Sequence, residues 1–378
     1  MAVPGEPHDD VVRPLYEAAR RALPAGATWS DAHTHVGQDD PDGFTGTAGE
    51  LLAALDRAGH RRALVFPMQE PAGYPPANDR VRLDAEASGG RLAWLGRIDP
   101  NAPRAIAEAR RCLRAGARGL KLHPRSDAFG LPHPVVDEVA ALVAAERGIL
   151  LVHAGRGIPN LGEAAVALAR RHPDLRLVLA HAGISDLGWL VEPARELPNL
   201  LFDTSWWQVW DLLQLFAHVP PARILYASDL PYGSGVMAGL LCLRCALEVG
   251  LEGDVLAAIV GGQLERLLAG EPPLELGPPP GPPRDEPRRL DLDRAVAHLT
   301  AAAQATLRGG DPAEALALAR LACQSPHGDP VLACVDGLAA RAQEAQDGAP
   351  PGGPERWPGL YAVFAAHLVA GTPHVALV

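Results

Sequence analysis

Three features are scarce in this chain of 378 residues, and each scarcity excludes a class of protein. No apolar run reaches the roughly 20 residues that cross a bilayer, so no membrane partner is expected. Acidic residues outnumber basic ones, and the net charge of -11 argues against a nucleic-acid partner. The five cysteines are odd in number and irregularly spaced, so they predict no disulfide framework.

The beginning of the chain lacks the apolar core of a signal peptide, since Glu6, Asp9 and Asp10 occupy that region. Cys242 and Cys245 form a C-x-x-C pair, but leucine and alanine flank them, so burial in a helix is favoured over redox or metal chemistry. With cysteines of this kind, the cytoplasm is the expected compartment.

Short runs rich in Leu, Val and Ile alternate with alanine-rich segments of helical length. The apolar runs predict eight strands, at 29–35, 63–67, 92–98, 117–123, 149–153, 175–181, 200–204 and 224–229. The segments between them predict helices at 49–58, 78–87, 102–115, 135–147, 161–171, 187–196 and 209–217, and a leading helix is expected at 11–23. Continuous apolar runs suit parallel strands buried on both faces, and the alternation is typical of βαβ units.

We therefore predict an α/β fold, a (β/α)₈ TIM barrel over residues 1–270, because eight such units need about 250 residues. The alternative is an open, doubly wound sheet. A glycine-rich loop after the first strand would favour that alternative, and the sequence has none there.

The pattern changes after the barrel. Residues 271–290 are proline-rich and predict an extended, semi-rigid linker. Residues 291–378 predict helices only, at 291–307, 313–323, 331–344 and 360–368, with a weakly tetratricopeptide-like rhythm but no full repeat. This all-helical appendix is the expected surface for a second copy of the chain or for a protein partner.

Titratable side chains gather where the predicted strands end. The alternation of an extended strand directs Asp31, His33 and His35 to one face. Further residues of this kind end the fourth, fifth, sixth and eighth strands: Lys121, His123, His153, His181 and Asp229. Active sites of (β/α)₈ barrels lie at that end of the strands, and imidazole and carboxylate are ligands of divalent metals. The sequence therefore predicts a metal site, with zinc as the expected ion.

The motifs at these positions are D-x-H-x-H, K-L-H-P, two H-A-G segments and S-D-x-P-Y. Together they resemble the strand-end motifs of the amidohydrolase superfamily, most closely its amidohydrolase-2 branch of TIM-barrel metal-dependent hydrolases and decarboxylases. The resemblance covers about residues 29–270. It implies that His33, His35, His153 and Asp229 hold the metal, and that His181 is an acid/base or a ligand of a second metal.

Asp229 is the expected proton acceptor for a metal-activated water and returns the proton to the leaving group. Lys121 has two interpretations: a carboxylated lysine bridging two metals, or a lysine paired with an acidic neighbour or orienting substrate. His123 shares its face and is a candidate substrate contact. Arg125 and Arg156 follow the fourth and fifth strands and could clamp a substrate carboxylate.

Trp206, Trp207 and Trp210 follow the seventh strand and could wall the pocket, although packing tryptophans and surface arginines would look the same. The predicted function is a metal-dependent hydrolase acting on a small amide, ester or lactone. The first alternative is a non-oxidative decarboxylase at the same site. The second is a non-catalytic metal-binding barrel with a helical interaction domain.

Overall fold

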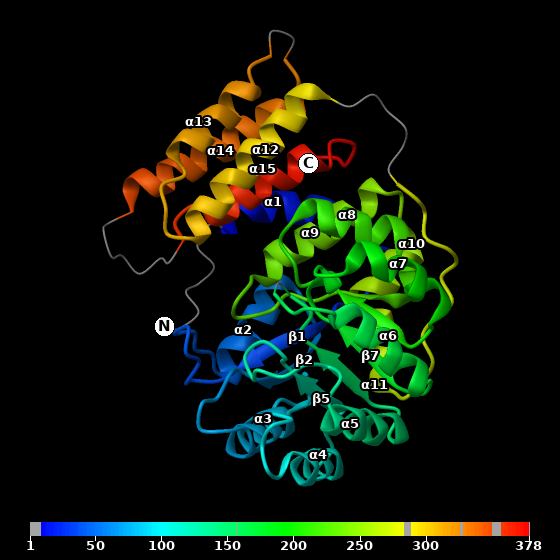
Figure 1. Cartoon of the computed structure of the whole chain (residues 1–378). Helices are drawn as coiled ribbons and strands as arrows, with labels where there is room; N and C mark the ends of the chain where they lie inside the picture. Colours follow the sequence, from blue (N-terminus) through cyan, green and yellow to red (C-terminus); the bar gives the residue numbers. More distant parts are fainter. Residues whose placement is uncertain (1–8, 156, 283–288, 326–327, 350–356, 378) are drawn as a thin grey trace.

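The computed structural model describes residues 9–155, 157–282, 289–325, 328–349 and 357–377 (Figure 1). Its strands are β1 Ser30–Val36, β2 Arg62–Pro67, β3 Leu92–Trp94, β4 Gly96–Arg97, β5 Gly119–Leu122, β6 Ile149–Val152, β7 Arg176–Leu179, β8 Leu200–Asp203 and β9 Ile224–Leu225. They pair in parallel in sequence order, β1 to β3 in one run and β4 to β9 in another.

The third predicted strand is split at Leu95, because β3 pairs with β2 whereas β4 pairs with β5. The ring closes between the last strand and the first. The backbone N–H of Ala32 donates to the Tyr226 carbonyl at 2.9 Å, and that of Asp229 donates to the His33 carbonyl at 2.9 Å. Counting β3 and β4 as one strand, the predicted (β/α)₈ barrel is confirmed.

Alternation along the strands explains both the barrel core and the polar mouth. One buried cluster includes Leu225 and Ala227 of the last strand and Ile149 and Leu151 of β6, together with leucines of α11 (Gln263–Leu268). Two residues after Ala227 on the same face comes Asp229, and two residues after Leu151 comes His153. The apolar interior therefore gives way to titratable side chains at the carboxyl ends of the strands.

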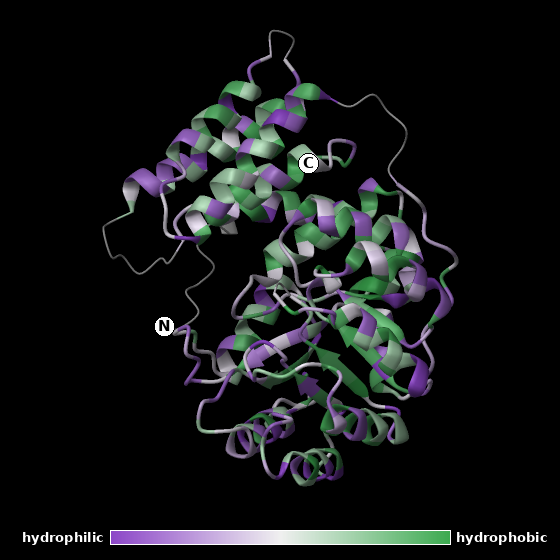
Figure 2. Ribbon diagram, in the orientation of Figure 1, coloured by the Kyte–Doolittle hydropathy of each residue, from purple (hydrophilic) through white to green (hydrophobic). Residues whose placement is uncertain are grey.

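Helices cover the outside of the barrel, and Figure 2 shows the apolar strands enclosed by helices with polar outer faces. They are α1 Asp9–Arg20, α2 Ala48–Ala58, α3 Pro75–Ala87, α4 Ala105–Arg114, α5 Pro134–Ala145, α6 Leu161–Arg171, α7 Leu187–Glu196, α8 Val209–His218, α9 Gly235–Glu248 and α10 Gly253–Ala257, with a π-helix at Ala258–Gly262 and 3₁₀ turns at His181–Gly183 and Pro221–Arg223.

Local sequence signals explain where these helices begin. A capping box at Thr47 and Glu50 starts α2, and the left-handed Gly59 ends it. Helix α3 begins three residues before its predicted start, because proline fits the first helical turn, where its missing N–H costs nothing. Cys242 and Cys245 lie buried as free thiols in α9, so the packing interpretation of that pair is confirmed.

The C-terminal region contains α12 Leu290–Leu307, α13 Ala313–Ala322, α14 Pro330–Gly348 and α15 Leu360–Gly371. Helix α15 is apolar on nearly every side, as expected of a helix buried all round. It packs against α12 and α14 and also against α1, α8 and α9, so it joins the helical region to the barrel (Figure 1). None of the described helices is long and apolar enough to span a bilayer.

Specific contacts fasten α15 and the residues after it to the barrel. The Phe364 ring stacks on Trp207 with centroids 5.1 Å apart. The fully buried Arg244 of α9 donates to the Thr372 hydroxyl at 2.9 Å, the Thr372 carbonyl at 2.8 Å and the Ala376 carbonyl at 2.9 Å. The C-terminal helices are therefore held by buried polar contacts as well as by apolar packing.

Residues 271–282 of the predicted linker contain no helix or strand, but they are held against the barrel. The backbone N–H of Leu274 donates to Gln263 at 2.8 Å, and that of Gly281 donates to the Ala217 carbonyl at 2.9 Å. The division into a barrel at 1–270, a linker at 271–290 and a helical domain at 291–378 stays a proposal. The tetratricopeptide-like character of the helical domain and its role as a partner surface also stay proposals.

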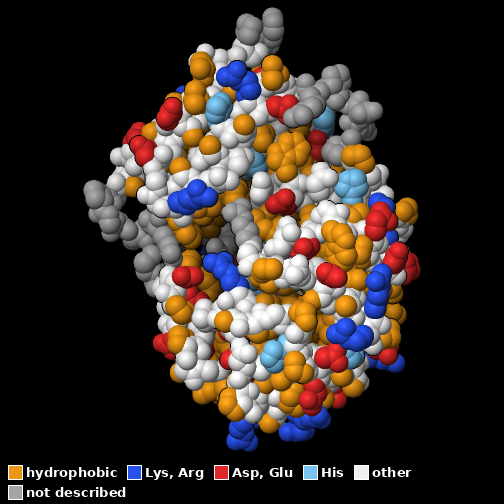
Figure 3. Space-filling model, viewed as in Figure 1, with side chains coloured by type: hydrophobic (Ala, Val, Ile, Leu, Met, Phe, Trp, Pro, Cys, Tyr) orange, Lys and Arg blue, Asp and Glu red, His pale blue; other side chains and the backbone are white. Residues whose placement is uncertain are grey.

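Figure 3 shows charged side chains of both signs on one face of the molecule. On that face the Lys and Arg side chains of the described residues are scattered among Asp and Glu rather than gathered into a basic patch.

Candidate metal centre and active site

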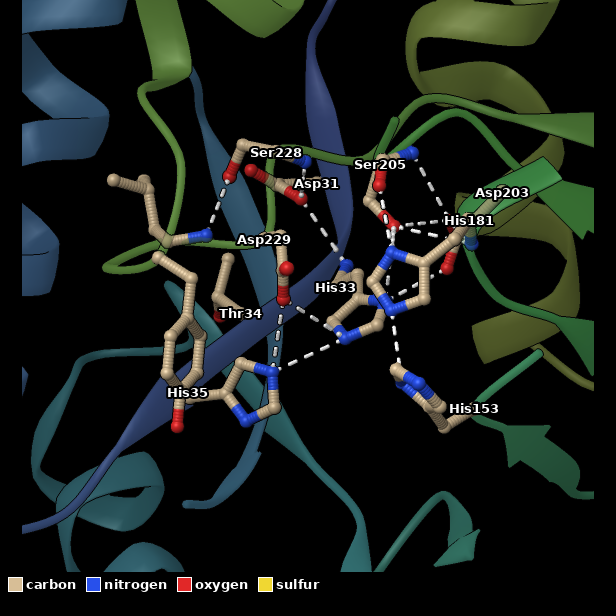
Figure 4. Close-up of polar contacts among 12 residues, drawn as sticks. Asp31, His33, Thr34, His35, His153, His181, Asp203, Ser205, Ser228 and Asp229 are labelled. Atoms are coloured by element: carbon tan, nitrogen blue, oxygen red, sulfur yellow. Dashed lines mark hydrogen bonds and ion pairs between the residues drawn. The ribbon is translucent and has the colours of Figure 1, made fainter. Parts of the chain in front are cut away.

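Three side chains converge at the mouth of the barrel (Figure 4). His33 Nε2 and His35 Nε2 lie 3.1 Å apart, and Asp229 Oδ1 lies 3.2 Å from the first and 3.1 Å from the second. Among the described residues this is the one group of three or more His, Cys, Asp or Glu side chains whose ligand atoms come together this closely. Two nitrogens and a carboxylate oxygen form a donor set suited to a divalent metal.

The orientation of the His33 ring is fixed from behind by Asp203, the last residue of β8. Asp203 Oδ2 lies 2.8 Å from His33 Nδ1, and both side chains are buried. Because the carboxylate only accepts hydrogen bonds, Nδ1 carries the hydrogen and Nε2 keeps its lone pair. This carboxylate–imidazole pairing is the arrangement that orients metal-bound histidines.

The other oxygen of Asp203 is saturated by donors. Asp203 Oδ1 accepts from the backbone N–H groups of His181 at 2.9 Å and Ser205 at 3.0 Å, and from the Ser205 hydroxyl at 2.5 Å. Asp203 therefore links His33 of β1 to His181, which follows β7, and to Ser205, which follows β8. Sequence analysis missed it, although its position at the end of the predicted strand 200–204 was a usable signal.

His181 and His153 lie side by side at the edge of the cluster. His181 Nδ1 donates to the Ser205 carbonyl at 2.7 Å, which in the neutral ring leaves the lone pair on Nε2, and Nε2 faces His153 Nδ1 at 3.0 Å. His153 Nε2 points toward Gly155, where an added Cβ would lie 2.8 Å away. The structure therefore places the predicted ligand His153 beside His181 rather than within the group of His33, His35 and Asp229.

The backbone at two of these residues adopts a conformation that side chains disfavour. Asp229 has a φ of 60° and His181 a φ of 55°, both in the left-handed region. Non-glycine residues in this region store strain and concentrate at active sites. Their shared conformation therefore supports a functional role for both.

Burial holds the imidazoles neutral. The pKa values of His33, His35, His123 and His153 lie well below the ordinary 6.5, mainly because the surrounding protein excludes water and secondarily because neighbouring positive groups disfavour another charge. Neutral imidazole is the form that binds metal.

Asp229 and Lys121 are shifted in the directions that burial dictates. Desolvation raises the pKa of Asp229 to about 6, although the positive charges nearby oppose this shift. Desolvation lowers the pKa of Lys121 to about 7, against the attraction of Asp203 and Asp229. Lys121 is fully buried and its Nζ makes no hydrogen bond to any described residue, lying instead 4.8 Å from the Phe66 ring centroid.

The remaining predicted contacts are distributed around the same opening. The His123 ring stacks on His153 with centroids 3.8 Å apart. Arg125 lines the opening as an exposed residue, and Trp206 stands at its edge with its indole N–H donating to Asp211 at 2.7 Å. Arg156 lies outside the described residues. Trp210 is 42% exposed and lines none of the described cavities.

Two further residues at the opening were missed by sequence analysis. Arg97 ends β4 and is 1% exposed, and its Nε has no hydrogen-bond partner among the described residues. Its position at the end of the third predicted strand was the available signal. The Tyr232 hydroxyl donates to Asp40 at 2.6 Å and its ring meets His35 edge-on, with centroids 5.0 Å apart. Tyr232 belongs to the S-D-x-P-Y motif, which indicated the segment but not the role.

The opening is a cavity of about 320 Å³. Besides the histidines, its walls carry basic side chains, those of Arg97, Lys121 and Arg125, and acidic side chains, those of Asp40, Asp42 and Asp229. A second cavity of about 320 Å³ adjoins it and is mainly apolar. A concave site with a few convergent polar groups beside apolar walls is the usual form of a small-molecule site.

Comparison with known proteins identifies one protein family. Residues 30–318 match the family model described as amidohydrolase. Among curated proteins, none matches the chain.

Solved structures provide fold neighbours. 5-Carboxyvanillate decarboxylase LigW from Sphingomonas paucimobilis is 18% identical with a TM-score of 0.52, covering 65% of this chain and 99% of that one. A putative amidohydrolase from Staphylococcus aureus is 15% identical with a TM-score of 0.53, covering 64% and 99%. A manganese-bound dihydroxybenzoic acid decarboxylase from Polaromonas is 13% identical with a TM-score of 0.52, covering 64% and 97%. At such identities the likeness shows the fold, and about a third of this chain has no counterpart in these neighbours.

Proposed function

The chain belongs to the amidohydrolase family and is a metal-dependent enzyme, and from this premise we propose that it hydrolyses a small amide, ester or lactone. The observation that carries the proposal is the convergence of His33 Nε2, His35 Nε2 and Asp229 Oδ1 within 3.2 Å of one another beside a cavity. Two neutral ring nitrogens and a carboxylate at that spacing suit a shared divalent cation.

The proposed metal ligands are His33, His35 and Asp229, whose ligand atoms converge, together with His153, which would join them by turning its ring away from His181. The hydrogen bond of Asp203 to His33 supports His33 as a ligand, since it leaves Nε2 unprotonated for the ion. Zinc is the proposed ion, and manganese is the second choice because one fold neighbour holds it. A divalent ion at this place supplies a water of lowered pKa and polarises the substrate carbonyl.

Two side chains would then handle the proton. Asp229 directs one oxygen at the imidazoles, while its side chain is 23% exposed to the cavity, so it can accept a proton from the attacking water and return it to the leaving group. His181 is the alternative acid/base, because its Nδ1 is held by the Ser205 carbonyl and its Nε2 keeps a lone pair. Lys121 and Arg97 are available to hold an anionic part of the substrate.

Non-oxidative decarboxylation is the second candidate. Arg97 and Arg125 place two guanidinium groups around the cavity and Lys121 adds an amine, which suits a substrate carboxylate next to the reacting carbon. Two of the fold neighbours described above are decarboxylases, which agrees with this candidate. The proposed compartment is the cytoplasm, supported by five free thiols.

The test combines product analysis with one substitution. The metal-loaded enzyme is offered small esters, lactones, amides and carboxylated rings while acid release and carbon dioxide release are measured separately. Acid release supports hydrolysis, and carbon dioxide release replaces it with the second candidate. Asp229→Asn keeps the shape but not the basicity, so turnover should fall by about a hundredfold or more while the fold is retained. Near-normal turnover with metal bound would exclude Asp229 as the base and leave His181.

A further inference from the structure

The apolar cavity adjoins the cavity of the metal site and shares part of its wall. Arg125, His153, His181, Asp229 and Tyr232 line both the polar cavity and the apolar one. A compound whose reacting group lies at Asp229 therefore has an adjoining space of about 320 Å³ for the rest of its structure. Together the two spaces fall within the range of small-molecule sites.

The wall of the apolar cavity comes from two distant parts of the sequence. On the barrel side it is formed by Trp206, Trp207 and residues of α9 such as Met237, Ala238 and Leu241. On the opposite side it is formed by the C-terminal region, with Leu307 at the end of α12, Trp357 in the turn before α15, and Leu360, Tyr361 and Phe364 in the first turns of α15.

The aromatic rings of this wall hold one another in place. Phe364 stacks on Trp207 at 5.1 Å with an interplanar angle of 18°, and the Tyr361 ring lies 6.4 Å from Phe364. Trp206 lies 6.0 Å from Trp207. Arg244 anchors the far end of α15 through its hydrogen bonds to the residue that follows the helix, Thr372. Tyr361 and Phe364 of the wall are therefore carried by a helix that is fixed at its far end.

We propose that the start of α15 and the turn before it form the distal wall of the substrate pocket, and that the substrate carries an apolar, ring-sized group that binds against Trp357, Tyr361 and Phe364. The inference rests on the proposed function, because it takes the metal site as the place of reaction. The wall combines residues of α9 and of the segment after β8 with residues of the C-terminal region, so the proposed pocket depends on both parts of the chain.

The test measures binding rather than turnover. Cyclohexanecarboxylate and acetate share the carboxylate that hydrolysis of an ester or amide would leave, and they differ only in the apolar group. Calorimetric titration into the full-length, metal-loaded protein gives both dissociation constants. Cyclohexanecarboxylate should bind at least tenfold more tightly than acetate, since its ring removes apolar surface from water.

Three variants locate the site of this preference. Tyr361→Ala and Trp357→Ala remove half-buried parts of the wall, and Ala238→Leu fills the cavity from α9. In each, the preference for cyclohexanecarboxylate should fall to about threefold or less while acetate binding is unchanged. Trp189→Ala is the matched control, because Trp189 is 52% exposed on α7 and outside the cavity. It should keep the full preference.

Equal binding of the two acids by the native protein would overturn the inference, and so would an unchanged preference in the folded variants. The outcome is separable from that of the proposed reaction. If the protein prefers cyclohexanecarboxylate in a way that depends on Tyr361 but turns over no substrate, the proposed hydrolase activity is refuted and the proposed pocket stands. Turnover without the preference refutes the pocket and leaves the hydrolase.

Discussion

Replacing Asp203 with Asn should change which nitrogen of His33 carries the hydrogen while hardly changing the size of the side chain. In the native chain, Asp203 Oδ1 accepts from two backbone N–H groups, those of His181 and Ser205, and these donors cannot reverse. The Asn carbonyl oxygen must therefore occupy that position, and its NH₂ group then faces His33 Nδ1, 2.8 Å away in the native protein. Nδ1 becomes the acceptor, the hydrogen moves to Nε2, and Nε2 no longer binds a metal.

The magnitude follows from what the substitution removes. Loss of the group that orients a metal-bound histidine weakens metal binding by about 10–100-fold. This corresponds to about 1.4–2.7 kcal/mol of binding free energy. The fold should survive, because Asn has nearly the same shape and still accepts from His181 and Ser205.

The assay is a competition titration of Zn²⁺ against a chromophoric chelator, with thermal unfolding of the metal-free protein as a check on the fold. Asp186→Asn is the control, because Asp186 likewise accepts from a backbone N–H, that of Gly162 at 2.8 Å, but does not line the cavity of the three ligand atoms. If folded Asp203→Asn binds Zn²⁺ as tightly as the native chain and the control, the role assigned to Asp203 is wrong.

Three further predictions concern other parts of the molecule. Gly155→Ala should displace the His153 ring, since the new Cβ would lie 2.8 Å from its Nε2. The free energy of unfolding should fall by about 1–3 kcal/mol and turnover at least tenfold. A variant with native unfolding and native turnover would contradict this. Burial lowers the pKa of His367 to about 4 from the ordinary 6.5, so its contribution to stability is complete above pH 6.5 and is lost as the pH falls toward 4. Between pH 8 and pH 5 His367 should therefore account for about 2 kcal/mol of the fall in the free energy of unfolding, and His367→Gln should reduce the total fall by that amount in denaturant titrations, leaving the share of the other buried histidines; an unchanged total would refute it. A chain ending at Gly270 should aggregate on size-exclusion chromatography, because α1, α8 and α9 would lose the apolar face of α15 that covers them; a monodisperse product would instead support an independent barrel.

Much of the barrel could be predicted because its signals are local. Continuous apolar runs such as 149–153 and 175–181 specify strands buried on both faces, and their polar last residues follow from the alternation of side chains. The split of the third strand at Leu95 could not be predicted, because the change of partner depends on backbone pairing and leaves no trace in hydropathy.

The candidate site could be predicted in part for the same reason. His33, His35 and Asp229 meet because all three end strands of one closed barrel. Asp203 was missed since a single carboxylate at a strand end resembles any solvated acidic residue until the fold places it 2.8 Å from His33. The direction of the His153 ring depends on side-chain rotation, which spacing along the sequence does not specify.

The contribution of α15 to a cavity wall lay beyond sequence analysis as well. The apolar segment at 360–368 indicates a buried helix, but nothing in its composition names the surface that buries it. Only the folded chain brings Phe364 onto Trp207, more than 150 residues earlier in the sequence, with the two ring centroids 5.1 Å apart.

Metal content tests the central claim most directly. The full-length protein is dialysed against Zn²⁺ or Mn²⁺ and analysed for bound metal, next to His35→Gln, which leaves the buried pair of His33 and Asp203 intact. The site predicts about one divalent ion per native chain and a loss of that ion in the variant, with thermal unfolding showing that the fold remains. A native chain that binds no stoichiometric metal, or a folded variant that keeps it, would contradict the assignment of this site as the metal centre.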